Sequence, residues 1–358
     1  MAFDVVRVAA FGPSPSVFSE GGLQTGSSPG QRLAHPTPPA LGSDRHGLSR
    51  RWVVLICVVA TLAVAVTYLA MRGVGEPGRT VESLQTLIGR QFSGERIYTN
   101  MAVDLPASRD RSVQSTGWLD YHDVNSWHLV GGAKICYAWG DIAAGRYDAW
   151  WFTQAQSIKA WGYPMYLSFM HEPSVNQSNH PQCGTPAEYV AAYDHLVQLF
   201  VAQGVANVTW VWTLTASAFA GAKGGPKIWE PAGYDVVGVD GYNHAIKWRT
   251  PRDIFQAAEA FASSRGKPLL IGEIGSDEQV GSANGKADWI TQAAALFQSW
   301  GDVRAVMWTN TGNGGNYWLD SSSESLAAFT AAGRMQYYSV RSDHFVDGGA
   351  IWGIYSRG

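Results

Sequence analysis

Short apolar runs alternate with helix-like stretches from about residue 90 to residue 335. The runs are rich in β-branched and aromatic residues, and both of their faces are apolar, which is typical of parallel strands covered by helices. Their starts lie 27 to 43 residues apart, the size of one βα unit. The pattern predicts strands at 96–102, 134–139, 164–170, 207–214, 234–240, 268–272 and 303–309.

Helix start signals stand between these runs. Residues 185–188 read TPAE, a capping box with proline at the first helical position, and predict a helix to about residue 203. Residues 250–253 read TPRD, a second motif of this kind, and predict a helix at 254–264. Further helices are expected at 148–160, 286–299 and 324–332.

Eight such units close an α/β barrel of the (β/α)8, or TIM, type, and seven strands are visible. The spacing places the missing first strand one unit earlier, at 67–74. We therefore expect a (β/α)8 domain over residues 67–338, with its site at the C-terminal ends of the strands. Residues 339–358 form a C-terminal tail for which the sequence predicts no role.

The N-terminal part of the chain has a different composition. Pro, Gly and Ser make up 20 of residues 1–50, which predicts a disordered tail, unless this stretch is upstream sequence absent from the natural product. Residues 51–71 form a hydrophobic segment in which 52–71 carry no charge. It can be a membrane anchor, a signal peptide cleaved near Ala63-Val64-Ala65, or a buried helix.

The strand expected at 67–74 overlaps the hydrophobic segment and affects how that segment is interpreted. If 67–71 belongs to the barrel, the apolar segment shrinks to 52–66, which is short for a membrane span and suitable for a signal peptide. Either export interpretation makes the protein extracytoplasmic, secreted or anchored through this segment alone. Cys57 lies in the segment, so Cys136 and Cys183 remain as a disulfide or as two buried thiols.

Charged residues at strand ends are the candidate chemistry. Glu172 follows the predicted fourth strand and Glu273 the predicted seventh, once the strand at 67–74 is counted. An unpaired carboxylate that interrupts an apolar run is costly to bury, so both indicate function or an ion pair. Two opposed carboxylates of unequal pKa suit cleavage of a glycosidic bond, in which one donates a proton and the other stabilises or attacks the sugar.

Several sequence runs together resemble glycoside hydrolase family 26, a group of β-mannanase-like enzymes in the clan of retaining (β/α)8 glycosidases. They are the His171-Glu172 pair and the segments 204–212 (GVANVTWVW), 237–243 (VGVDGYN), 271–275 (IGEIG) and 306–308 (VMW). The resemblance covers residues from about 67 to 335.

The resemblance implies roles for individual residues. Glu172 would be the acid/base and Glu273 the nucleophile of a retaining mechanism. Tyr242 would lie beside the nucleophile, and Asp240 and His171 would contact substrate. The two remaining expected substrate contacts are tryptophans: Trp308 as a stacking platform and Trp139 in a more distant subsite.

The implied substrate is a β-linked polysaccharide or oligosaccharide, with β-1,4-mannan first and β-glucan or β-1,3-xylan as alternatives. The choice among these substrates stays open because the chain departs from the family pattern around the His-Glu pair. Ser168-Phe169-Met170 stands where arginine is common in the family. A barrel that binds carbohydrate without cleaving it is the alternative from another class.

Other chemistries fit the sequence less well. Five histidines between residues 122 and 195 form no His-Glu-x-x-His motif, so we expect neither a catalytic metal nor another cofactor. With 26 Lys and Arg against 29 Asp and Glu, no basic surface for nucleic acid is predicted. The sequence leaves the oligomeric state open.

Overall fold

The structure, a computed structural model, describes residues 80–338 and the backbone of a strand at Ile351–Tyr355. The predicted tail at 1–50, the hydrophobic segment at 51–71 and the strand at 67–74 lie outside the described residues. Within the described part, no helix is both long and apolar enough to cross a membrane.

Eight parallel strands form a closed barrel, as the sequence predicts. In order around the barrel they are β1 (Gly94–Asn100), β10 (Ile351–Tyr355), β9 (Val303–Thr309), β8 (Leu269–Ser276), β7 (Val236–Asn243), β6 (Val208–Thr215), β5 (Met165–Phe169) and β2 (Leu119–Asn125), which pairs with β1. Six of the seven strands predicted from apolar runs are therefore confirmed as barrel strands.

Three strand assignments need correction. The run at 134–139 is not a barrel strand: β4 (Ala133–Cys136) pairs antiparallel with β3 (Trp127–Val130) in a separate hairpin. The barrel strand β2 was not predicted, because polar residues interrupt its LDYHDVN sequence. The eighth strand is β10, which lies in the predicted C-terminal tail, so the barrel closes without a strand at 67–74.

These corrections change the strand numbering of the candidate site. Counted along the described chain, Glu172 follows the third barrel strand and Glu273 lies in the sixth, rather than the fourth and the seventh. The two positions remain three strands apart, so the expectation that they share the barrel mouth is unaffected.

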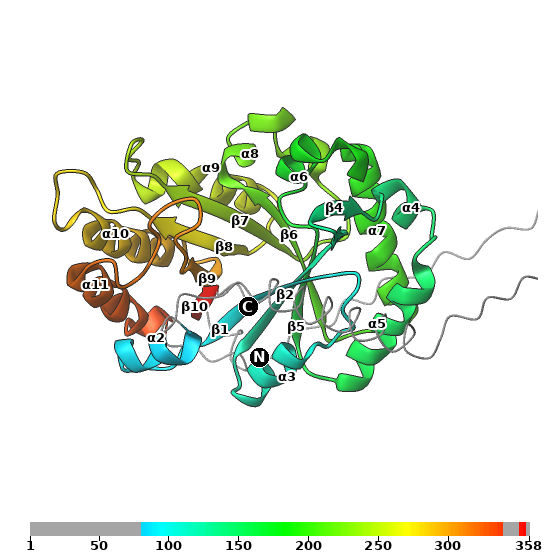
Figure 1. The fold of residues 1–358 in the computed structure, drawn as a ribbon, viewed down its shortest axis with the longest axis horizontal. Helices are drawn as coiled ribbons and strands as arrows, with labels where there is room; N and C mark the ends of the chain where they lie inside the picture. The colour runs from blue at the N-terminus through cyan, green and yellow to red at the C-terminus, as the bar shows by residue number, and fades with distance from the viewer. Residues whose placement is uncertain (1–79, 339–350, 356–358) are drawn as a thin grey trace, which may run out of the picture. The chain divides into compact units, whose positions relative to one another are not determined.

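Helices line the outside of the barrel (Figure 1). The long ones are α5 (Asp148–Trp161), α7 (Pro186–Ala202), α9 (Pro251–Ser264) and α10 (Gly285–Trp300), and the shorter ones are α2 (Val81–Ile88), α3 (Ser108–Ser115), α4 (Trp139–Ala143), α6 (Pro173–Asn179), α8 (Ala216–Phe219) and α11 (Ser323–Gly333). The predicted capping boxes begin α7 and α9. The side chains of Thr185 and Thr250 accept hydrogen bonds from the backbone N–H groups of Glu188 and Asp253, respectively.

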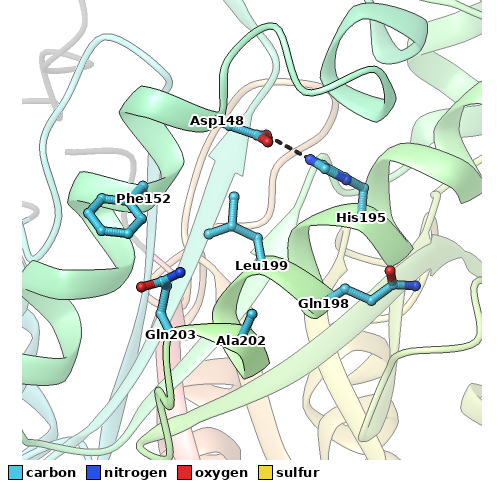
Figure 2. A pocket seen from close by; sticks show the side chains of 7 residues that line it. All are labelled: Asp148, Phe152, His195, Gln198, Leu199, Ala202 and Gln203. Atoms are coloured by element: carbon cyan, nitrogen blue, oxygen red, sulfur yellow. Dashed lines mark hydrogen bonds and ion pairs between the residues drawn. The ribbon is translucent and has the colours of Figure 1, made fainter. Parts of the chain in front are cut away.

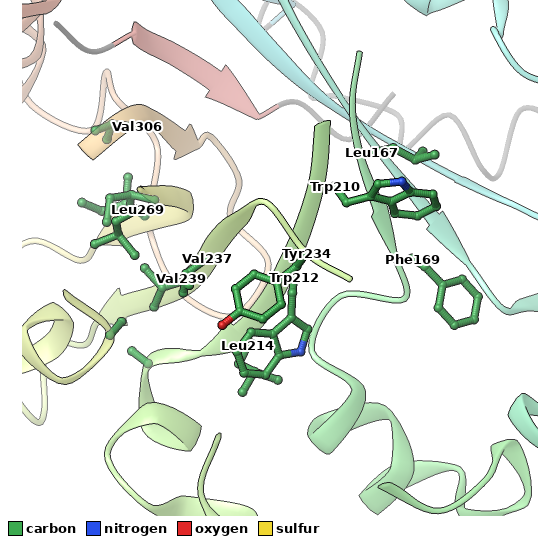
Figure 3. Close-up of a cluster of buried hydrophobic side chains, with 14 of the residues drawn as sticks. Leu167, Phe169, Trp210, Trp212, Leu214, Tyr234, Val237, Val239, Leu269 and Val306 are labelled. Carbon is green, nitrogen blue, oxygen red and sulfur yellow. The ribbon is translucent and has the colours of Figure 1, made fainter. Parts of the chain in front are cut away.

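Two apolar layers hold the barrel together. Alternate strand residues meet inside it, among them Tyr121, Leu270 and Met307, and form a small central cluster. The opposite faces of the strands pack against the helices in a larger, aromatic-rich cluster, part of which Figure 3 shows around Trp212 and Tyr234. Parallel strands buried on both faces explain why the apolar runs of the sequence predicted most of them.

Candidate active site

An irregularity in β8 turns Glu273 toward the barrel mouth. The register of β8 shifts against both neighbours around residues 271–274. Leu270 belongs to the cluster inside the barrel, whereas Ile271 and Ile274 belong to the outer layer. Residues 272 and 273 therefore both lie between two outward-facing residues, as at a β-bulge. A β-bulge near an active site can change the direction in which a side chain points.

Tyrosines on two other strands hold the Glu273 carboxylate. The hydroxyl of Tyr98 in β1 donates a hydrogen bond to Oε1, and that of Tyr242 in β7 donates to Oε2. The Arg96 guanidinium lies 3.5 Å from Oε1. These two hydrogen bonds and the nearby guanidinium fix the orientation of the carboxylate. Tyr242 thus lies beside Glu273, where the resemblance placed it.

Glu172 follows β5 on a backbone of unusual conformation. Met170 has φ 50° and Glu172 has φ 48°, so two non-glycine residues on either side of His171 adopt the left-handed region. Pro173 then begins α6, and the backbone N–H of Glu172 donates to the Thr213 carbonyl on β6 at 3.0 Å. Such strain persists where surrounding structure holds it, commonly at functional sites.

The surroundings of Glu172 favour its protonated form. Burial, reinforced by the negative charges of Asp240 and Glu273, raises the pKa of Glu172 to about 8. A carboxylic acid that stays protonated at neutral pH can serve as a general acid. The two acids therefore have different environments: that of Glu172 favours a proton donor, whereas two tyrosines donate hydrogen bonds to Glu273. Acid-assisted displacement requires two acids that differ in this way.

His171 forms an ion pair with Asp123. Its Nδ1 donates to Asp123 Oδ1 at 3.1 Å, and its ring lies edge-on to Tyr98. Burial alone would lower the pKa of His171, but the charge and hydrogen bond of Asp123 raise it to about 9. Burial alone would raise the pKa of Asp123, but His171 and Arg96 together lower it to about 2. His171 is therefore a cation next to Glu172 at neutral pH.

Arg96 connects the acids at the bottom of the site. Its Nη1 donates to Asp240 Oδ1 at 2.8 Å and its Nη2 to Asp123 Oδ2 at 3.1 Å, and all three side chains are fully buried. The guanidinium carbon lies 4.7 Å from the centre of the Tyr98 ring and 4.6 Å from that of Tyr121. One cation thus serves carboxylates on different strands and is covered by two aromatic rings.

Asp240 keeps one oxygen free in this arrangement. Its Oδ2 is buried and has no hydrogen-bond partner among the described residues. Burial raises the pKa of Asp240 to about 7, since the neighbouring Glu273 reinforces the effect and Arg96 only partly offsets it. A buried unpaired oxygen beside the two glutamates can accept a hydrogen bond from a ligand hydroxyl.

The two tryptophans expected to contact substrate are buried instead. Trp308 is 1% exposed, its ring contacts Trp289 and Phe329, and its indole N–H donates to the Tyr317 carbonyl at 2.8 Å. It belongs to the core and does not fit the expected role of a sugar platform.

Trp139 is likewise unexposed at 0%. It begins α4 rather than ending a barrel strand, and its indole N–H donates to Ser126 Oγ. Its neighbours are Tyr189 and Trp229, so no ring face is free for a subsite. A large aromatic at a strand end is therefore insufficient evidence for sugar stacking, because the same ring fills the core equally well.

Sequence reasoning missed Arg96, Tyr98 and Asp123. A charge inside the run RIYTNMA was the available signal for Arg96, and Tyr98 follows it two residues later on the same face. Asp123 lies in β2, the strand whose polar residues hid it. Asp123 was missed because the polar interior of a site interrupts the apolar pattern that reveals strands, whereas Arg96 and Tyr98 lie in a strand that this pattern did predict.

A disulfide joins Cys136 to Cys183, with a Cα–Cα distance of 5.2 Å. It links the β3–β4 hairpin to the short helix Pro181–Cys183, which follows α6 and hence Glu172. Of the two alternatives left open by the sequence, the structure therefore has the disulfide.

Two hollows among the described residues lie away from these groups. One of about 360 Å³ lies between α5 and α7, where Asp148 and His195 form a hydrogen bond of 2.7 Å (Figure 2). Another of about 500 Å³ is lined by Glu230, Arg265 and their neighbours. Neither hollow is lined by Glu172 or Glu273.

Two groups of described residues bring potential metal ligands within 4.8 Å of one another: Asp110, Asp120 and His122, and His171, Asp240 and Glu273. In the second group Arg96, Asp123, Tyr98 and Tyr242 pair with His171 Nδ1, with Asp240 Oδ1 and with both Glu273 oxygens, whereas Asp240 Oδ2 has no partner among the described residues.

No family model matches the sequence. Endoglucanase H of Acetivibrio thermocellus is 28% identical over 269 residues, a match that covers 70% of this chain and 28% of that protein. The chain thus spans far less than two thirds of the length of this relative.

Solved structures share the fold at low sequence identity. An endo-β-1,4-mannanase double mutant from Cellulomonas fimi is 17% identical, with a TM-score of 0.50 over 75% of this chain and 70% of its own. A family 26 β-mannanase from Bacteroides ovatus is 12% identical, with a TM-score of 0.50 over 73% and 84%. A Bacteroidetes-affiliated family 5 cellulase is 11% identical, with a TM-score of 0.52 over 79% and 91%. In sequence motifs and in barrel fold, the chain resembles glycoside hydrolase family 26 and its clan of β-glycosidases.

Proposed function

We propose that the protein is a retaining β-glycoside hydrolase in which Glu172 is the acid/base and Glu273 the nucleophile. The observation that carries the proposal is the unequal environment of the two acids. The pKa of Glu172 is raised to about 8, whereas Glu273 accepts hydrogen bonds from two tyrosines and lies 3.5 Å from Arg96.

In the first step Glu273 attacks the anomeric carbon while Glu172 protonates the departing glycosidic oxygen. The bond to the leaving group breaks and a glycosyl ester forms on Glu273. In the second step Glu172, now ionised, takes a proton from water, which attacks the anomeric carbon and releases Glu273. Proton and leaving group are thereby balanced over the two steps with no cofactor.

The proposed substrate is a β-linked polysaccharide or oligosaccharide, with β-1,4-mannan as the first candidate. The mannanases among the structural neighbours support this choice. A β-glucan is the next candidate, supported by the names of the endoglucanase relative and the family 5 cellulase. The β-1,3-xylan alternative rests on fold alone.

We further propose that the barrel acts outside the cytoplasm. The disulfide between Cys136 and Cys183 supports this location, since such bonds persist in oxidising compartments. Whether the segment at 51–71 is a cleaved signal or an anchor stays a prediction; N-terminal sequencing and membrane fractionation of the exported protein distinguish the two.

Product analysis tests the proposed activity. The wild-type protein and Glu273→Ala are incubated with β-mannan, mixed-linkage β-glucan and β-1,3-xylan, and reducing ends and oligosaccharides are measured. We expect one polysaccharide to be cleaved with retention of anomeric configuration, observed by ¹H NMR, and turnover by the variant to fall by orders of magnitude with an unchanged circular dichroism spectrum. Binding without release of reducing ends favours the non-catalytic carbohydrate-binding alternative and refutes the proposal.

A further inference from the structure

The outer face of the barrel wall carries a buried polar group that the proposed reaction does not use. Leu119 of β2 belongs to the cluster inside the barrel, whereas Val124 of the same strand belongs to the outer layer. Because side chains alternate along a strand, Asp120 and His122 also face outward. Asp110 of α3 meets them there, and its Oδ1 lies 2.6 Å from His122 Nδ1.

Three potential ligand atoms converge in this group. One atom from each of Asp110, Asp120 and His122 lies within 4.8 Å of the other two, and none of the three residues is more than 2% exposed. Ligand atoms that share one metal ion at about 2.1 Å lie no more than about 4.2 Å apart. The three side chains therefore need to move by about 1 Å or less to bind a single ion.

Asp120 is the member of the group that lacks a partner. Both of its carboxylate oxygens are buried and have no hydrogen-bond partner among the described residues. In the same part of the structure its strand neighbour Glu95 has an ion pair with Arg109, and Asp110 has one with His122. A buried carboxylate without a partner is costly, so two unpaired oxygens beside other ligand atoms indicate that a cation binds there.

His122 is held in the way that metal-binding histidines are. Its Nε2 lies 2.7 Å from Thr99 Oγ1 on β1. With the ring proton on Nε2, this nitrogen donates to Thr99, and Nδ1 faces Asp110 Oδ1 with a lone pair, an arrangement that an ion between the two atoms stabilises. A hydrogen bond from the second ring nitrogen commonly fixes the tautomer and direction of a metal-binding histidine.

We propose that Asp110, Asp120 and His122 bind one divalent metal ion, for which Zn²⁺ is the best match. One imidazole nitrogen with carboxylate oxygens suits Zn²⁺, whereas Ca²⁺ and Mg²⁺ prefer oxygen ligands. The ion is structural: it joins α3 to β2 on the face of the barrel wall opposite Asp123. The proposal is therefore independent of the proposed hydrolysis.

The first test measures metal binding by the wild-type protein, purified without a histidine tag. The protein is stripped with EDTA and brought to equilibrium by dialysis against Zn²⁺, and bound metal is measured by inductively coupled plasma mass spectrometry. We expect one saturable Zn²⁺ per chain. At free Zn²⁺ of about 100 times the Kd, the melting temperature should lie about 5 °C or more above that of the stripped protein. No saturable binding, or an unchanged melting temperature, overturns the inference.

The second test compares Asp120→Asn and His122→Gln with a matched control, His195→Gln. His195 and Asp148 form a partly exposed pair at 2.7 Å, which is the kind of surface site where zinc binds adventitiously. We expect Asp120→Asn and His122→Gln to lose the saturable zinc and the zinc-dependent rise in melting temperature, and the control to keep both. Binding that persists in Asp120→Asn and disappears in His195→Gln places the zinc at the surface and overturns the inference.

A proton shared between Asp110 and Asp120 is the alternative explanation of this group. In that case Zn²⁺ changes the melting temperature of neither the wild-type protein nor Asp120→Asn, and the inference fails. Asparagine has nearly the volume of aspartate and removes a buried charge, so this variant should fold; if it does not, the wild-type comparison between EDTA and Zn²⁺ still decides. No step of the test uses a glycoside, so failure of the proposed function leaves its outcome unchanged.

Discussion

Raising the pH through 8 should remove the proposed general acid. Glu172 has its pKa raised to about 8 by burial and by the charges of Asp240 and Glu273. The functional form is the protonated one, so activity is present below this pH and lost above it. About nine tenths of the protein carries the proton at pH 7 and about one tenth at pH 9. We therefore expect kcat/KM on a polysaccharide to fall about tenfold for each pH unit well above 8.

The assay measures initial rates of release of reducing ends from pH 5 to pH 10, with stability checked at each pH. An aryl glycoside of the same sugar, whose leaving group needs little protonation, serves as the matched substrate. Its alkaline limb should be much weaker, because the step that Glu172 assists is no longer difficult. Glu172→Ala should retain cleavage of the aryl glycoside to the intermediate, and added azide should accelerate its turnover.

Two results would refute this reasoning. An alkaline limb below about pH 6 would show that Glu172 has the ordinary pKa of a glutamate. Equal alkaline limbs for the polysaccharide and the aryl glycoside would place the titrating group elsewhere. His171 is a distinct candidate for that second outcome, since its pKa is raised to about 9, and a His171→Gln variant would then lose the limb.

Three further predictions concern other parts of the site and the fold. Tyr242→Phe removes one of the two hydroxyl donors to Glu273, so kcat/KM should fall by about 10- to 100-fold, as expected for a hydrogen bond to a charged group; a fall below threefold would argue against this contact. Trp308→Phe removes a buried indole and its hydrogen bond to Tyr317, so chemical denaturation should give a free energy of unfolding lower by about 1–3 kcal/mol with KM unchanged. A raised KM without loss of stability would restore the stacking role expected from the sequence. Cys136→Ser opens the loop closed by the disulfide, and thermal denaturation should show a loss of about 2–4 kcal/mol relative to the oxidised protein but none relative to the reduced one.

The barrel itself could be predicted because its evidence is local. Parallel strands covered on both faces give apolar runs such as PMYLSFM and PLLIG, and the helices between them begin at capping boxes such as TPAE. Glu172 and Glu273 were found by the same logic, since a carboxylate that ends an apolar run is conspicuous. One failure followed from the converse case: β2 carries Asp120, His122 and Asp123 and so lacks an apolar run.

The sequence by itself determined the repeated βα architecture and the two glutamates, because strand burial and helix capping depend on neighbours a few residues away. Only the tertiary structure decided which strands close the barrel, that Trp308 and Trp139 are core residues, and that Arg96, Tyr98 and Asp123 surround Glu273 and His171. Those outcomes depend on contacts between strands such as β1 and β8, which are 175 residues apart at Tyr98 and Glu273. Burial, charge pairing and pKa are properties of such assembled neighbours, and no local pattern along the chain specifies them.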